Sequence, residues 1–148
     1  MTPPMTKPRV LLAEDNVDHA FFTTRAFQDA HGDELEMLTV QDGVQLLDYL
    51  NQRGEFAGAP RPHLIVLDLK MPKKGGLEVL EAMAAEPELR RIPVVVLSSS
   101  DRPEDIAASY AHGANSYVTK PASMSGLREG VGELARYWMD LASLPEPA

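Results

Sequence analysis

The chain has 148 residues, enough for one domain with a single hydrophobic core, and no apolar stretch approaches the roughly 20 residues of a membrane-spanning helix. Its 22 acidic residues outnumber its 14 basic residues, and the resulting net charge of −8 argues against direct binding to the phosphates of a nucleic acid. It has no cysteine, which excludes disulfide bonds and thiolate metal sites, and it begins without the apolar core of a signal peptide, so we expect a cytoplasmic protein.

The first strand is predicted at residues 9–13, a short aliphatic run typical of a strand that is buried on both faces. The preceding residues 1–8 contain three prolines and no periodic pattern, which indicates a flexible tail. Glu14 and Asp15 follow the strand directly. Asn16 can then cap a helix, because its side chain can accept a hydrogen bond from a backbone N–H of the first turn.

The second and third strands are predicted at residues 35–40 and 63–68. A helix with leucines on one face follows the second strand, and a turn rich in Pro, Lys and Gly at 69–76 leads from the third strand into another helix. The third strand is the more apolar of the two, and it ends in Asp68. This carboxylate is expected at the carboxyl end of a buried strand, although the local stretch alone fits a turn or capping aspartate equally well.

The fourth strand, at residues 93–97, is the most strand-like run in the chain and ends in Ser98. The helix before it is expected to end at Pro87, because proline lacks the backbone N–H that a continuing helix needs. Ser100 or Asp101 can cap the helix that follows. The order of strand and then helix therefore continues.

The last strand is predicted at residues 116–119 and leads into Lys120 and then a long helix. One face of this helix carries apolar residues at alternating spacings: Leu127, Val131, Leu134, Trp138 and Leu141. Most of this face has to cover the sheet. At ~1.5 Å per residue, however, the helix extends beyond a sheet of short strands. We expect Tyr137, Trp138 and Leu141 to form an exposed apolar patch that supports a homodimer.

The repeated alternation of strand and helix predicts an α/β fold, in which a doubly wound parallel sheet of five strands carries helices on both faces. The carboxyl ends of parallel strands share one edge, where ligands bind in such folds. That edge gathers these polar residues: Glu14, Asp15, Asp68, Ser98 and Lys120. Three carboxylates offer oxygen ligands for a hard cation such as Mg²⁺. The cation would keep Asp68 ionised as a nucleophile for phosphoryl transfer, with Lys120 and Ser98 contacting the phosphoryl oxygens.

Four motifs, in order, resemble the receiver domain of two-component response regulators: residues 12–16, residues 66–72, Ser98 after its strand, and residues 117–121. The resemblance extends over residues 9–142, and the segments 1–8 and 143–148 would be tails outside the receiver. It implies a flavodoxin-like sheet with the strand order 2-1-3-4-5.

The resemblance also implies a Mg²⁺ site. Its ligands would be Asp15 and Asp68, Glu14 acting mainly through water, and the backbone carbonyl of Lys70. The sequence departs from the common receiver pattern at Gly75, where many receivers have an acid or an amide. This departure concerns the hydrogen bonding of the turn and not the chemistry.

The same resemblance implies that Asp68 is the phosphoacceptor and that Lys120 contacts the phosphoryl group, with a cis peptide between Lys120 and Pro121 to direct it. Ser98 would be the switch hydroxyl and Tyr117 the switch aromatic. A receiver of this kind catalyses its own phosphorylation and dephosphorylation and has no separate substrate to turn over.

The partner that the resemblance implies is a sensor histidine kinase, and the downstream protein target stays open. The chain ends soon after its last helix, so we expect output through protein contacts and not through an attached effector domain. Residues 137–141, residues 144–145 and the loop at 54–62 are similar to single-domain regulators of phytochrome-type histidine kinases. Such a kinase is the expected partner, and neither a nucleic acid nor a membrane is.

Three other classes share parts of this pattern. A phosphohydrolase of the haloacid-dehalogenase type also uses an Asp nucleophile and Mg²⁺, but normally has a second Asp two residues later, where this chain has Lys70. A flavodoxin-like FMN carrier would need a phosphate-binding loop rich in Ser, Thr and Gly after the first strand. A receiver that only docks partners is disfavoured by the complete set of acids, lysine and hydroxyl. Labelling with a small phosphodonor and Mg²⁺ distinguishes these classes.

Overall fold

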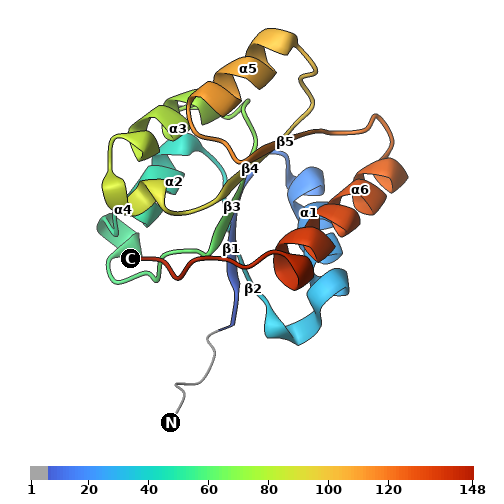
Figure 1. The fold of residues 1–148 in the computed structure, drawn as a ribbon, viewed down its shortest axis with the longest axis horizontal. Helices are drawn as coiled ribbons and strands as arrows, with labels where there is room; N and C mark the ends of the chain where they lie inside the picture. The colour runs from blue at the N-terminus through green and yellow to red at the C-terminus, as the bar shows by residue number, and fades with distance from the viewer. Residues whose placement is uncertain (1–6) are drawn as a thin grey trace.

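The computed structural model describes residues 7–148, so most of the predicted tail at 1–8 lies outside the described residues. Five parallel strands form one sheet in the order β2-β1-β3-β4-β5, as predicted (Figure 1). The strands are β1 (Arg9–Ala13), β2 (Glu36–Val40), β3 (Leu64–Leu67), β4 (Val94–Ser98) and β5 (Ser116–Thr119). Each agrees closely with its predicted range.

Helices cover both faces of the sheet (Figure 1). One face carries α1 (Val17–His31) and α6 (Met124–Arg136), and the other carries α2 (Gly43–Leu50), α3 (Gly76–Ala84), α4 (Pro87–Arg90) and α5 (Pro103–Ala111). Short 3-10 helices occupy Gly32–Glu34 and Gly54–Phe56. Within residues 7–148, no helix is both long enough and apolar enough to cross a membrane.

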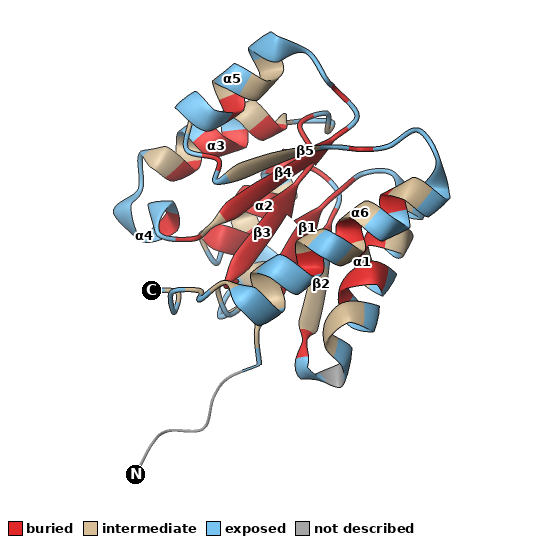
Figure 2. Cartoon of the chain, turned by 45° about the vertical axis from the view of Figure 1, so that its right-hand side comes forward, coloured by how far each residue is buried: buried red, intermediate tan, exposed pale blue. Residues whose placement is uncertain are grey.

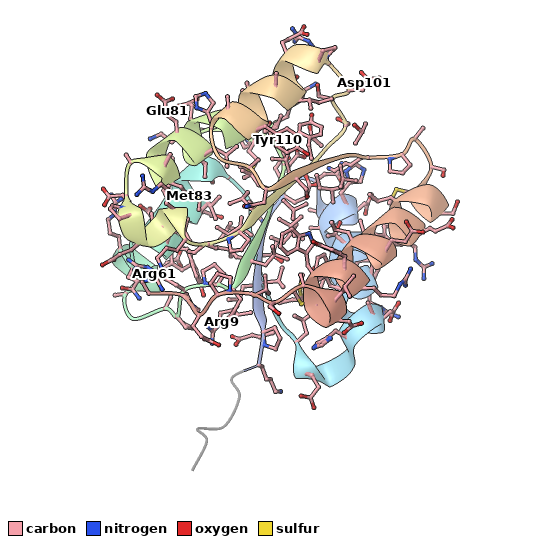
Figure 3. All side chains as sticks on the ribbon, viewed as in Figure 1. Arg9, Arg61, Glu81, Met83, Asp101 and Tyr110 are labelled. Carbon is pink, nitrogen blue, oxygen red and sulfur yellow. The ribbon has the colours of Figure 1, made fainter. Side chains whose placement is uncertain are left out.

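The side chains of the strands alternate between two hydrophobic cores. Leu11 of β1 belongs to the core beneath α2 and α3, whereas Leu12 belongs to the core beneath α1 and α6. Met83 of α3 is buried in the first of these cores, while Glu81 of the same helix lies at the surface (Figure 3). Figure 2 shows that the central strands are buried, as expected for a parallel sheet covered on both faces. The sheet is therefore a firm support for the residues at its carboxyl edge.

Two predicted helix ends differ from the structure. Pro87 does not end α3, which stops before it; instead Pro87 is the first residue of α4. Proline suits this position because the first helical N–H has no intrahelical partner. The cap predicted for α5 is also wrong, since Arg102 is the N-cap and Pro103 begins the helix. The Ser100 hydroxyl is not the cap of α5; it donates to the side chain of Asp105 in that helix.

The last helix continues beyond α6 as a π-helical turn, Tyr137–Leu141, after which the chain folds back toward the sheet (Figure 1). Trp138 is half-buried and packs against the core beneath α1 and α6. Tyr137 and Leu141 are 50% and 77% exposed. The predicted apolar patch is therefore present for Tyr137 and Leu141, but including Trp138 in it was wrong because that ring covers the core.

Candidate metal and phosphoryl site

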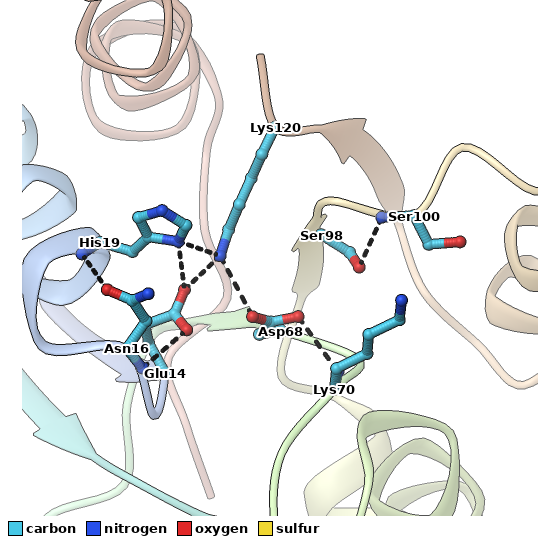
Figure 4. Close-up of polar contacts among 8 residues, drawn as sticks. All are labelled: Glu14, Asn16, His19, Asp68, Lys70, Ser98, Ser100 and Lys120. Atoms are coloured by element: carbon cyan, nitrogen blue, oxygen red, sulfur yellow. Dashed lines mark hydrogen bonds and ion pairs between the residues drawn. The ribbon is translucent and has the colours of Figure 1, made fainter. Parts of the chain in front are cut away.

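The carboxyl ends of the strands bring together the polar side chains that the sequence singles out. Glu14 follows β1, Asp68 follows β3, Ser98 ends β4 and Lys120 follows β5. Backbone hydrogen bonds extend the sheet past these ends: the Asp68 N–H donates to Ala13 O at 3.1 Å, and the Lys120 N–H donates to Ser98 O at 2.7 Å. These bonds fix the backbone positions from which the side chains meet (Figure 4).

Three carboxylates form a cluster at this edge. One oxygen atom from each of Glu14, Asp15 and Asp68 lies within 4.8 Å of the other two. Glu14 and Asp68 are only 3% and 8% exposed, whereas Asp15 is exposed. The Lys70 N–H donates to Asp68 Oδ1 at 3.1 Å, which places the Lys70 peptide beside the cluster. The set offers oxygen ligands alone, and it fits a hard divalent cation that keeps several waters.

Lys120 partly neutralises this cluster. Its Nζ donates to Glu14 Oε1 at 2.5 Å and to Asp68 Oδ2 at 3.1 Å, and its side chain is 4% exposed. A buried charge of this kind requires such partners. No cis peptide occurs among residues 7–148, so the cis bond predicted between Lys120 and Pro121 is wrong. The Lys120 backbone is held by Ser98 O, and its side chain reaches the carboxylates from a trans peptide.

The surroundings of Glu14 change its pKa strongly. Burial raises the pKa of Glu14 from 4.5 to about 7; the hydrogen bond and charge of Lys120 oppose this rise, and the negative charge of Asp68 adds to it. Without a cation, Glu14 is therefore a carboxyl group that takes up a proton near neutral pH. A divalent cation at the cluster would compete with that proton.

His19 also contacts Lys120, although the sequence did not single it out. Its Nδ1 lies 2.9 Å from Lys120 Nζ. His19 belongs to the first turn of α1, and its backbone N–H donates to the side chain of Asn16 at 3.0 Å, which confirms the predicted N-cap. Burial, and next the charge of Lys120, lower the pKa of His19. Since 101 positions separate His19 from Lys120, local sequence patterns carry no signal for this contact.

The residues expected to act as a switch are joined by hydrogen bonds. Ser98 Oγ is fully buried and accepts from the Ser100 N–H at 3.3 Å. The Ser100 carbonyl oxygen accepts from the Tyr117 hydroxyl at 2.7 Å. The Ser100 hydroxyl in turn donates to Asp105 of α5 at 2.5 Å. Ser100 therefore links Ser98, Tyr117 and the start of α5.

The loop after β3 is closed by its backbone. A Cβ atom at Gly76 would lie 2.8 Å from Asp68 O, so only glycine allows this close approach. Gly75, where the sequence departs from the receiver pattern, is the N-cap of α3 and makes no side-chain cap. Backbone bonds from the Gly76 N–H to Leu69 O at 2.9 Å and from the Val79 N–H to Gly75 O at 3.1 Å close the turn instead.

Comparisons of the sequence give one family. The pattern of the response regulator receiver domain matches residues 10–131. The chain is 37% identical over 136 residues to the response regulator Rcp1 of Synechocystis sp., covering 92% of both proteins. It is 39% identical over 139 residues to a probable methanogenesis regulatory protein, FilR2, of Methanothrix harundinacea, covering 94% of this chain and 88% of that protein.

Solved structures give the same result. The phosphorylated cyanobacterial phytochrome response regulator RcpA is similar with a TM-score of 0.89 and 42% identity, covering 93% of this chain and 98% of that chain. The Mn²⁺-bound form of Rcp1 is similar with a TM-score of 0.89 and 36% identity, covering 93% of this chain and 99% of that chain.

We expect metal binding to depend on pH through Glu14. The pKa of Glu14 is about 7, so below this pH the cation has to displace the proton of Glu14. The association constant for Mg²⁺ should therefore fall by up to about tenfold for each pH unit below that value. Titration calorimetry between about pH 6 and pH 8 measures this dependence. In Glu14→Gln, binding should be weaker at high pH and should lose this steep pH dependence.

The same group gives a stability test in excess chelator. The folded protein holds the Glu14 proton up to about pH 7, whereas the unfolded chain releases it near 4.5, so this contribution to stability is lost as the pH rises between these values. Thermal unfolding across this range should therefore show a fall that Glu14→Gln lacks. Identical pH profiles in both proteins would contradict the assignment.

Proposed function

The chain belongs to the receiver domain family of response regulators, and on this premise we propose that Asp68 accepts a phosphoryl group from a sensor histidine kinase with Mg²⁺ bound beside it. One observation supports this proposal most: the buried carboxylate of Asp68 lies at a strand end, close to oxygens of Glu14 and Asp15 and in contact with Lys120. A nucleophile, a cation site and a positive side chain are what phosphoryl transfer to a carboxylate needs.

The side chains have separate tasks in the proposed transfer. Three carboxylates and one carbonyl would hold the cation: Glu14, Asp15, Asp68 and Lys70. The bound cation supplies positive charge that offsets the carboxylates and the phosphoryl oxygens. A carboxylate oxygen of Asp68 forms a bond to phosphorus as the bond from phosphorus to the imidazole nitrogen of the kinase breaks, which leaves an acyl phosphate on Asp68. Lys120 Nζ and the Ser98 hydroxyl donate hydrogen bonds to phosphoryl oxygens.

We propose that Ser98 and Tyr117 transmit the conformational effect of phosphorylation to the surface. In the structure Ser98 Oγ accepts from Ser100, whose carbonyl holds the Tyr117 hydroxyl. When Ser98 turns to the phosphoryl group, its bond to Ser100 changes, and so does the contact that holds Tyr117. The surface formed by β5 and α5 is then the one that responds.

The finer identity of metal and partner is proposed from the chemistry and the relatives together. Oxygen ligands suit Mg²⁺, and a divalent cation, Mn²⁺, is bound in the structure of Rcp1. RcpA is a phytochrome response regulator, which supports a phytochrome-type histidine kinase as the partner of this chain. A haloacid-dehalogenase-type phosphohydrolase is not favoured, because Lys70 occupies the position of its second aspartate.

The extent and location of the receiver are also proposed. We place the receiver at residues 9–142, which contain the whole sheet and α1 to α6. A cytoplasmic location fits the proposed activity, because histidine kinases take their phosphoryl group from cytoplasmic ATP.

Asp68→Asn should abolish labelling, because an amide is a far weaker nucleophile than a carboxylate. The measurement is intact mass after incubation with acetyl phosphate and Mg²⁺, where the wild type should gain one phosphoryl group and the variant none. Asp101→Asn, at an exposed loop residue, serves as the control and should label normally. Full labelling of Asp68→Asn, or labelling of the wild type in excess chelator, would show that the proposed site is wrong.

Lys120→Ala should still bind Mg²⁺ but should lose most of the conformational response, because its charge contacts the phosphoryl group and not the cation. With beryllofluoride as the phosphoryl mimic, we expect binding at least about tenfold weaker, the cost of losing a charged hydrogen bond. Ser98→Ala should shift binding in the same direction, but less. Lys7→Ala, at an exposed lysine, is the control. A wild-type chemical-shift response in either active-site variant would refute these roles.

We also propose a homodimer that uses the turn after α6. Tyr137 and Leu141 are exposed apolar side chains on this one π-helical turn, and one patch used twice is the commonest way for proteins to dimerise. Trp138 contributes to the core and is unsuitable for a surface test.

Leu141→Asp should therefore shift a wild-type dimer to monomer in sedimentation velocity, because the patch would have to bury a charge. Val44→Asp changes an exposed apolar residue on α2, at the other face of the sheet, and should leave the dimer intact. A monomeric wild type at micromolar concentrations, or a dimer that survives Leu141→Asp, would remove this surface from the proposal.

A further inference from the structure

The ammonium group of Lys120 has three N–H donors and three acceptors. It donates to Glu14 Oε1 at 2.5 Å, to Asp68 Oδ2 at 3.1 Å and to His19 Nδ1 at 2.9 Å. Figure 4 shows His19 and Asp68 on opposite sides of this group. Because the Lys120 side chain is 4% exposed, water has little room to replace an acceptor that is lost.

This contact determines the state of the imidazole ring. An ammonium group can only donate, so His19 Nδ1 has to be the acceptor, and the ring is neutral with its proton on Nε2. The lowered pKa of His19 agrees with a neutral ring at pH 7. Asn16 accepts from the backbone N–H of His19, which fixes the position in the first turn of α1 from which the ring extends toward Lys120.

Two of the three acceptors of Lys120 belong to the proposed cation site, and the third does not. The oxygens of Glu14 and Asp68 belong to the acid cluster that a divalent cation would use, and the cation repels the ammonium. His19 Nδ1 is 4.0 Å from Glu14 Oε1 and is not a member of that cluster. It is the acceptor of Lys120 that such a cation would leave free.

We propose that His19 is a positioning residue that keeps the Lys120 ammonium hydrogen-bonded and within reach of Asp68 when a divalent cation takes the carboxylates. The inference rests on the proposed phosphorylation of Asp68 and adds to it a residue that acts through Lys120. His19 touches neither the cation nor the phosphoryl group. It makes the free energy of cation binding more favourable, because the buried Lys120 ammonium keeps one hydrogen-bond partner when the cation binds.

The contact itself is tested in the metal-free protein. Long-range ¹H–¹⁵N NMR spectra distinguish the two neutral tautomers of a histidine ring, and His19 should show a protonated Nε2 and an unprotonated Nδ1. In Lys120→Met, the Nδ1 resonance should move, because its donor is gone. A proton on His19 Nδ1, or a resonance that Lys120→Met leaves unchanged, would overturn the inference without reference to metal binding.

Three substitutions then test the role. His19→Leu fills the site with an apolar side chain that cannot accept, whereas His19→Asn places a carbonyl oxygen near the position of Nδ1. Gln28→Leu, at an exposed neutral residue of the same helix, is the matched control. Calorimetry should show that His19→Leu binds Mg²⁺ about tenfold more weakly, while His19→Asn and Gln28→Leu stay close to the wild type.

Labelling at saturating Mg²⁺ gives the second measurement. His19→Leu should accept a phosphoryl group from acetyl phosphate more slowly, and His19→Asn should recover most of the rate. Wild-type metal binding by His19→Leu, tighter binding by it, or an equal loss in His19→Asn would overturn the role of His19. If the wild type binds Mg²⁺ but is not labelled on Asp68, the proposed function fails while the metal-binding pattern of the variants still tests His19.

Discussion

The candidate site depends on one buried ion cluster at the carboxyl edge of the sheet. Lys120, which follows β5, donates to the carboxylates that follow β1 and β3, so one ammonium group links residues at the ends of three strands. Glu14 and Asp68 are nearly buried, and their repulsion would be costly without that positive charge. The same arrangement would couple cation binding to the position of Lys120, because a cation that binds these carboxylates has to displace the ammonium from them.

The sheet and most of the candidate site could be predicted from the sequence for a simple physical reason. The three central strands are short aliphatic runs that end in or before a polar residue, the last strand leads into Lys120, and parallel strands place those ends at one edge. Glu14, Asp68, Ser98 and Lys120 were therefore expected to meet although they are far apart in the chain. The helix boundaries were harder, because a proline such as Pro87 can end one helix or begin the next, and the packing of the loop decides which.

His19 and Trp138 show what local patterns could not reveal. His19 lies in the first turn of α1, and its side chain reaches Lys120 because α1 packs against α6, the helix that follows β5 and Lys120 in the chain. Trp138 continues the apolar face of α6 and was expected to project, but the change to a π-helical turn and the return of the chain lay its ring on the core. Both outcomes depend on how helices are placed on the sheet, which periodicity does not specify.

The bonds around Asp68 also explain why a local event can change a distant surface. The Lys120 N–H donates to Ser98 O, and Ser98 Oγ accepts from the Ser100 N–H. The Ser100 carbonyl oxygen in turn accepts from the Tyr117 hydroxyl. The hydroxyl expected to contact the phosphoryl group thus ends β4, and the lysine directly follows β5; β4 is fully buried, and β5 is paired with it in parallel. Strands packed in this way resist gradual distortion, so the loops that follow them have to take up the change. The free energy available for that change is the difference between the contacts that the phosphoryl group makes in the two loop arrangements.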